Sequence, residues 1–170
     1  MNKLYNVNKK KSQNFDAFIK EYNNVIFKVC YSYTDNREDF EDYYQEVCYQ
    51  LWRSIDSFKG DSKLSSWVYR VALNVCFLQL KRKKRNIKTS NFEYIDIVDN
   101  NSNDKEESIQ LLYASIRELL PAERALIILF LEDKSYKEMA EILGITVTNI
   151  GARINRTKNK LKKIIALKAD

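Results

Sequence analysis

The sequence predicts an all-α protein made of two small helical domains joined by a linker. Only three glycines and one proline occur in 170 residues, whereas all-β folds need such residues in frequent turns. Apolar residues recur at intervals of three and four along most of the chain, which is typical of amphipathic helices. Residues 87–108 lack this periodicity, and a loop of that length is unusual inside one compact domain.

The composition is that of a soluble globular protein, with 45% hydrophobic and 31% charged residues. The longest wholly apolar run, residues 125–131, is far shorter than the roughly 20 residues of a membrane span. No apolar stretch follows the N-terminal lysines, so no secretory signal is indicated. We therefore expect a cytoplasmic protein that does not insert into a membrane.

The first half is predicted to form a three-helix domain over residues 14–86, after a polar N-terminal tail of residues 1–13. The apolar stripe of its first helix is Phe15, Phe18, Ile19, Tyr22, Ile26 and Val29. That of the second, over about 38–54, is Phe40, Tyr43, Tyr44, Val47 and Leu51. A break at 58–62 precedes a third helix over 64–85, whose inner face is Trp67 or Val68, then Val71, Val75 and Leu78.

The second domain is predicted over residues 109–170, after an acidic linker of residues 87–108. Its first helix carries Ile109, Leu112, Ile116 and Leu119 on one face. This helix ends before Pro121, which suits the first turn of a helix that continues to Leu131.

A helix-turn-helix is predicted next. Ser135 and Glu138 match a capping box, Gly144 permits the positive φ that ends a helix, and Thr146 can cap the helix that follows. The last helix buries Ile150, Ile154 and Leu161 and presents Thr148, Asn149, Ala152, Arg153 and Arg156 outward. Hydroxyl, amide and guanidinium groups suit base edges and phosphates, so DNA binding is favoured over an ordinary αα-corner with a solvated basic face. Gly151 lies within this helix at a cost of about 1 kcal/mol relative to alanine, and it either admits DNA close to the backbone or only weakens the helix.

Charge is segregated along the chain, whose formal net charge is +6. Residues 142–169 contain seven cations and no acid, and a second basic run occupies 81–85. This distribution favours a nucleic-acid partner. In contrast, residues 35–46 hold six acids and one arginine. Asp39, Asp42 and Glu46 form an acidic stripe with Gln45 beside it, which fits a solvated face, a Mg²⁺ site for nuclease chemistry or a docking surface for a basic protein.

Enzymatic chemistry is not indicated. The chain has no histidine, its three cysteines are widely spaced and fit buried core positions, and no glycine-rich phosphate loop occurs. We expect no catalytic residue, no metal site and no cofactor.

Two groups of residues resemble the sigma-70 family of bacterial RNA polymerase sigma factors. The residues at 38–53, with 58–62 and 66–74 (Ser66-Trp67-Val68-Tyr69-Arg70-Val71-Ala72, then Asn74), look like region 2. Leu120-Pro121, Ser135-Tyr136, Glu138-Met139-Ala140, Leu143-Gly144-Ile145 and Arg153 look like region 4. No region 1 or region 3 segment fits between them, and this plan resembles the extracytoplasmic-function (ECF) group.

The resemblance implies three binding surfaces. Core polymerase, through its β′ clamp helices, would be bound by Asp39, Asp42, Gln45 and Glu46. The −10 promoter element, with a flipped base, would be bound by Phe58, Lys59, Asp61, Ser62, Lys63, Trp67, Tyr69, Arg70, Asn74, Lys81, Arg82, Lys84 and Arg85. The −35 element would be bound by Thr146, Thr148, Asn149, Ala152, Arg153, Arg156 and Lys160.

The leading hypothesis is therefore an ECF sigma factor that binds core polymerase (β′ clamp helices and β flap) and promoter DNA and helps to open the duplex. The resemblance also implies an anti-sigma factor as a partner, able to hold the protein at the membrane. The second hypothesis is a helix-turn-helix regulator that acts without polymerase and uses the N-terminal bundle as a ligand-binding or dimerisation module. A stable dimer on a palindromic operator would favour it. The third is a metal-dependent nuclease that uses the acidic stripe.

Overall fold

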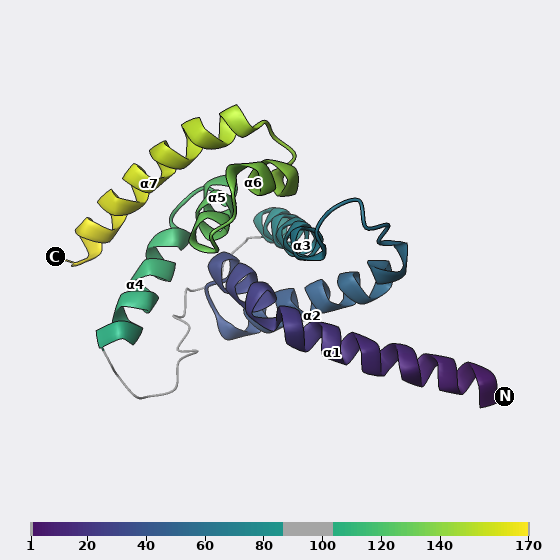
Figure 1. Ribbon diagram of the computed structural model, residues 1–170. Helices are drawn as coiled ribbons and strands as arrows, with labels where there is room; N and C mark the ends of the chain where they lie inside the picture. The colour runs from purple at the N-terminus through teal and green to yellow at the C-terminus, as the bar shows by residue number, and fades with distance from the viewer. Residues whose placement is uncertain (1, 87–103, 170) are drawn as a thin grey trace.

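The computed structural model describes residues 2–86 and 104–169, and the side chains of 15–85 and 107–168. Within these residues the chain is helical and contains no strand, as predicted. The elements are α1 (Asn2–Tyr33), α2 (Arg37–Ser54), the 3-10 turn η1 (Ile55–Ser57), α3 (Leu64–Asn86), α4 (Asp104–Arg117), α5 (Pro121–Leu131), α6 (Tyr136–Leu143) and α7 (Val147–Ala169). Figure 1 shows α1–α3 as one group and α4–α7 as a second group against it.

Helix α1 begins at Asn2, earlier than the sequence pattern indicates. Residues 2–13, which we predicted to be a polar tail, are helical and extend away from the rest of the molecule (Figure 1). This segment contains neither glycine nor proline, so nothing in it interrupts a helix that α1 continues. Apolar periodicity, which we used to find the start, reports only the part of a helix that packs against other elements.

Helices α1, α2 and α3 pack on one another around a common core. Side chains of Ile26, Val47, Leu51 and Val68 in this core are fully buried. The prediction that Leu78 lies on the inner face of α3 is wrong, because the residue is 56% exposed. Helix α3 contacts α1, α2 and α6, so its buried residues span more than one stripe and a single-face pattern misplaces some of them.

The cysteines behave as core residues. Cys30 and Cys76 are buried and Cys48 is half-buried, and all three are free thiols. Burial raises the pKa of the Cys76 thiol, and the neighbouring Cys30 raises it further. The thiolate is the nucleophilic form of cysteine, so a thiol with a raised pKa, such as that of Cys76, is a poor nucleophile.

Local signals in the second domain place its helices as predicted. Pro121 is the first residue of α5, and Ala125 to Leu129 of that helix are all buried. Ser135 and Glu138 form the capping box of α6, and Gly144 ends that helix with a φ of 66°. The Thr146 hydroxyl accepts a hydrogen bond of 3.3 Å from the backbone N–H of Asn149 at the start of α7. We predicted a linker over residues 87–108, but α4 already begins at Asp104. Residues 87–103 of the predicted linker lie outside the described residues.

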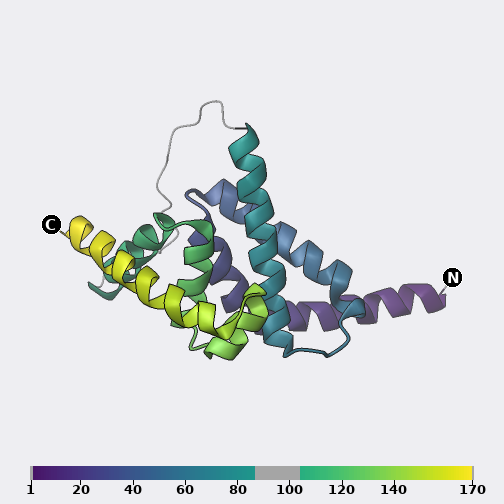
Figure 2. The same ribbon diagram turned by 90° about the horizontal axis from the view of Figure 1, so that it is seen from above.

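The two helical groups pack directly together. Helix α1 contacts α4 and α5, and α3 contacts α6. Buried residues of both groups belong to one hydrophobic cluster. In Figure 2, α5 and α6 lie beside α1 and α3, so both views agree on this arrangement.

Candidate functional site

The acidic residues of α2 separate into an outward and an inward set. Asp42 and Gln45 are exposed, together with Glu38 and Glu41, which the sequence interpretation did not single out. Asp39 turns inward, where Lys83 of α3 and the Asn36 amide donate hydrogen bonds to its carboxylate. Asp39 is therefore engaged within the domain, whereas Asp42 and Gln45 remain available to a partner.

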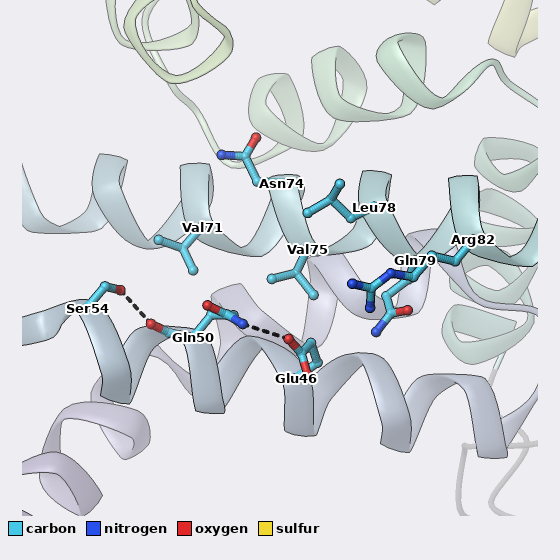
Figure 3. Close-up of a pocket in the computed structure, with 9 residues that line it drawn as sticks. All are labelled: Glu46, Gln50, Ser54, Val71, Asn74, Val75, Leu78, Gln79 and Arg82. Carbon is cyan, nitrogen blue, oxygen red and sulfur yellow. Dashed lines mark hydrogen bonds between the residues drawn. The ribbon is translucent and has the colours of Figure 1, made fainter.

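A pocket of about 280 Å³ lies between α2 and α3. Figure 3 shows Glu46, Gln50 and Ser54 on one wall and residues of α3 on the other. The Gln50 amide donates a hydrogen bond of 2.8 Å to Glu46, which holds that carboxylate along the pocket wall. Asn74 and Arg82 line the same pocket, so a residue predicted for polymerase binding and two predicted for DNA binding meet here.

The loop between η1 and α3 supports an aromatic cluster. Phe58 packs on Trp67 with ring centroids 5.3 Å apart, and Trp67 in turn lies 6.4 Å from Phe18 of α1. Gly60 turns the loop with a φ of 77°, and Lys59 and Asp61 are exposed around it. Ser62 is half-buried and Lys63 is exposed. The predicted flipped-base loop thus presents polar groups beside a half-buried indole.

Tyr69 is covered by the second domain. Its side chain is only 1% exposed, and its hydroxyl donates a hydrogen bond of 3.1 Å to Glu132. The Lys134 ammonium lies 5.1 Å from the centre of its ring. Burial, together with the Glu132 charge, raises the pKa of the Tyr69 hydroxyl. In this arrangement Tyr69 cannot contact DNA.

Two further residues of the predicted −10 surface are held by α6. Lys63 forms an ion pair of 2.8 Å with Glu138. Arg70 donates a hydrogen bond of 2.9 Å to the backbone carbonyl of Glu141, whose carboxylate lies 3.9 Å away.

The basic end of α3 is open. Lys81, Arg82, Lys84 and Arg85 are exposed, while Lys83 is bound to Asp39. Asn74 is also exposed. The part of the predicted −10 surface toward the end of α3 is therefore accessible, and only the part near α6 is covered.

The predicted −35 surface lies on the outer face of α7. Thr146, Thr148, Asn149, Ala152, Arg153 and Arg156 are all exposed. Ile150 and Ile154 are fully buried and anchor the opposite face. Lys160 differs from the rest, because it forms an ion pair of 2.7 Å with Glu123 of α5. Burial tends to raise the pKa of Glu123, but the hydrogen bonds from Lys160 and the Leu120 amide outweigh it and lower that pKa.

The sequence interpretation missed the residues that join the domains. Arg117 donates a hydrogen bond of 3.2 Å to the carbonyl of Tyr31 and lies 5.1 Å from the centre of its ring. The Tyr33 hydroxyl donates one of 2.7 Å to the carbonyl of Pro121. Lys28 and Glu132 form an ion pair of 2.6 Å. No local pattern marks these residues, since each contacts a partner at least 86 positions away in the chain.

Within the described residues, no helix is long and apolar enough to cross a membrane. In that same part of the chain, no three Cys, Asp or Glu side chains come together as metal ligands. In the acidic stripe, the Asp39 carboxylate already accepts a hydrogen bond from Lys83.

The fold and these surfaces define a two-domain helical protein that carries a helix-turn-helix, a second basic surface and an acidic helix face. Family models agree with this division. The sigma-70 region 2 model matches residues 18–86, and the sigma-70 region 4 model matches residues 109–161. The chain belongs to the ECF group of sigma-70 family RNA polymerase sigma factors.

Curated relatives include ECF sigma factors from several bacteria. SigW of Bacillus subtilis is 30% identical over 165 residues, which cover 87% of this chain and 88% of SigW. The sigma-E factor of Escherichia coli is 28% identical over 170 residues, with 89% and 88% of the chains covered. SigG of Mycobacterium tuberculosis is 23% identical over 185 residues; the match covers 92% of this chain but 50% of SigG, so the chain spans about half of that relative.

Two solved structures share the fold. RpoE of Bartonella quintana, in complex with the anti-sigma factor NepR, has a TM-score of 0.74 and 21% identity, with 91% of this chain and 98% of RpoE covered. CnrH, in complex with the cytosolic domain of CnrY, has a TM-score of 0.67 and 20% identity, with 94% and 90% covered.

Proposed function

We propose that this protein is a promoter-specificity subunit that binds core RNA polymerase, recognises −35 and −10 promoter elements and helps to open the duplex. It acts by binding and carries out no catalysis of its own. The observation that carries this proposal is the pairing of an outward acidic face on α2 with two basic faces, on α3 and α7, in one two-domain chain.

The acidic face is proposed to dock on the β′ clamp helices. Asp42 and Gln45 are exposed and supply the outer contacts. Glu46 lies at the edge of the α2–α3 pocket. Asp39 has the supporting role of fixing α2 against α3 through Lys83. Charge complementarity of this kind sets orientation and association rate more than affinity.

The two basic faces are proposed to bind promoter DNA. On α7, Asn149 and Arg153 have the chemistry to read base edges of the −35 element in the major groove, and the Thr148 hydroxyl lies beside them. On the first domain, Trp67 and Phe58 would stack on a flipped base of the −10 element, and the basic run 81–85 would bind phosphates.

An anti-sigma factor is a further proposed partner. RpoE of Bartonella quintana, which shares the fold, is bound by such a factor. The exposed aromatic residues Tyr49 and Trp52 on α2 continue the acidic face and add apolar area to it. We infer that a protein inhibitor would compete with polymerase for this face.

The test is selection of promoters from random double-stranded DNA by this protein together with core polymerase. The expected result is two separated sequence blocks that are enriched only when core polymerase is present. Enrichment of a single palindrome by the protein alone would instead identify a polymerase-independent dimeric regulator.

A further inference from the structure

The pocket between α2 and α3 opens beside the acidic face of α2. Asp42, Glu46 and Gln50 follow one another at intervals of four residues, so they lie along one side of that helix. Asp42 is exposed on the acidic face, whereas Glu46 and Gln50 line the pocket. The α2–α3 pocket is therefore continuous with the surface that is proposed to bind core polymerase.

The α3 side of the pocket is mainly apolar. Val71, Val75 and Leu78 line it, and Figure 3 shows the two valines pointing toward α2. Leu78 is 56% exposed, so much of its apolar surface is in contact with water. A partner that covers this surface with an apolar group gains binding free energy from the area removed from water.

The polar groups on the α2 side are already paired with each other. The Gln50 side-chain amide donates a hydrogen bond of 2.8 Å to Glu46, and the Ser54 hydroxyl donates one to the Gln50 backbone carbonyl. Both bonds run along the pocket wall in Figure 3. An occupant of the pocket thus gains more from covering the apolar side than from replacing these hydrogen bonds.

The size and the lining of the pocket favour an amino-acid side chain as its occupant. Drug-sized ligands fill pockets of roughly 300–1,000 Å³, and this pocket, at about 280 Å³, is smaller. Unpaired bases stack on aromatic rings, but none of the nine described residues that line the pocket is aromatic. An apolar side chain on a partner helix fits both observations, because helices bind grooves through such side chains.

Opposite charges meet at one end of the pocket. Glu46 of α2 and Arg82 of α3 both lie there, as Figure 3 shows, and within the described residues neither forms an ion pair. The exposed Asp42 adds negative charge on the α2 side, and the exposed Lys81 and Lys84 add positive charge on the α3 side. A partner helix with a cation on one flank and an acid on the other would be held in one orientation.

We propose that the α2–α3 pocket receives one apolar side chain from a helix of core RNA polymerase, with a cation of that helix over Glu46 and an acid over Arg82. The inference rests on the proposed function, because it takes core polymerase as the partner of α2. It adds Val71, Val75 and Leu78 of α3 to the polymerase-binding surface. Arg82 then contacts the polymerase at the edge of the basic run that is proposed to bind phosphates.

The test compares Leu78→Gln with Leu167→Gln in the full chain. Both changes replace an exposed leucine of a helix by glutamine, which has a similar helix propensity, so both variants should fold. Leu167 of α7 is 80% exposed and does not line the pocket. A second pair tests the charge: Arg82→Gln, with Lys20→Gln as the control at an exposed cation of α1. Circular dichroism checks the helicity of all four variants.

Affinity for bacterial core polymerase is measured by competition with fluorescently labelled wild-type protein. Leu78→Gln is expected to weaken binding about five- to tenfold, as for a side chain at the centre of an interface, and Arg82→Gln about threefold. Both controls should stay within about twofold of the wild type. Affinity for a labelled single-stranded DNA of about 15 nucleotides of mixed sequence, measured by anisotropy, should not change in Leu78→Gln.

Three results would overturn the proposal, and they have different meanings. Equal polymerase affinity of Leu78→Gln and Leu167→Gln, with the wild type bound, removes the pocket from the interface and leaves the proposed function intact. Weaker DNA binding by Leu78→Gln, with unchanged polymerase binding, identifies the pocket as a site for an unpaired base. Absence of polymerase binding by the folded wild type would contradict the proposed function itself.

Discussion

Glu138 and Lys63 lie 75 residues apart in the sequence and form an ion pair of 2.8 Å between the two domains. The other oxygen of Glu138 accepts hydrogen bonds from the Ser135 amide and hydroxyl, at 3.0 and 2.8 Å. One carboxylate therefore both starts α6 and joins the domains. Protonation of the Glu138 carboxylate would therefore weaken both the cap of α6 and the ion pair with Lys63.

Acid should loosen this contact. The Lys63 ammonium, with the Ser135 hydrogen bonds, lowers the pKa of Glu138 to about 2, from an ordinary value of 4.5. A group whose pKa is lower in the folded state stabilises that state fully above its ordinary pKa and loses the effect as the pH falls toward the lowered value. The other charged group facing this pair is Glu141. We expect the domains to separate progressively below about pH 4.5, as measured by small-angle scattering.

Glu138→Gln supplies the comparison for the acid titration. Its expansion with acid should be weaker over the same interval, because glutamine does not titrate. An identical acid profile in the two proteins would show that other carboxylates control the separation.

Arg124 should be important for stability. Its guanidinium donates hydrogen bonds to the carbonyls of Leu119, Arg117 and, at 3.4 Å, Ser32, and lies over the Tyr33 ring. Burial lowers the pKa of this arginine. Arg124→Ala leaves several carbonyls without their donor, so the free energy of unfolding should fall by about 2–3 kcal/mol.

Urea denaturation measures the effect of Arg124→Ala. The control is Arg37→Ala, which removes only an exposed pair with Glu41 on α2 and should change stability by less than about 0.5 kcal/mol. Equal losses in the two variants would mean that the hydrogen bonds of Arg124 contribute nothing beyond surface charge.

Gly151→Ala should stabilise the protein. A Cβ at this position would meet only the Tyr136 ring, at 3.7 Å, an ordinary van der Waals contact. Alanine inside a helix is favoured over glycine by about 0.5–1 kcal/mol. In contrast, Gly144→Ala at a φ of 66° should destabilise by about 1 kcal/mol.

DNA binding by Gly151→Ala separates the two interpretations of this glycine. Unchanged affinity for a −35 duplex, with higher stability, means that the residue only weakens the helix. Loss of affinity in the more stable protein means that DNA approaches the backbone at this position.

Arg153→Ala should weaken −35 binding mainly at one base pair, by about 1–3 kcal/mol, because its exposed guanidinium is suited to a bidentate base contact. The comparison is Lys162→Ala, which removes an exposed cation further along α7. This change should weaken binding to all DNA sequences by the same factor. Binding to a panel of single-base −35 variants measures both. A uniform loss for Arg153→Ala would reassign it to a phosphate contact.

Local signals in the sequence were enough to predict the helices and the helix-turn-helix. A capping box, a glycine with positive φ and Pro121 at a helix start each act over a few residues, so they can be read without the fold. The start of α1 was missed because residues 2–13 carry no apolar stripe. Leu78 was misplaced because α3 is buried on more than one side.

The candidate site was only partly predictable for the same physical reason. Exposed groups such as Asp42 and Arg153 follow from the helix faces they occupy. The engagement of Asp39 by Lys83, and the covering of Tyr69 by Glu132, join residues 44 and 63 positions apart. Such contacts depend on how helices and domains pack, and no spacing within one segment encodes them.

The most direct measurement of the proposed function is gel filtration of this protein with bacterial core RNA polymerase. The variant is Asp42→Lys with Glu46→Lys, and the matched control is Asp16→Lys with Glu21→Lys on α1 of the same domain. We predict that the wild type and the control co-elute with the polymerase, and that the α2 variant, checked for helicity by circular dichroism, does not. Co-elution of the α2 variant, or its absence for the folded wild type, would contradict the proposed role of the acidic face.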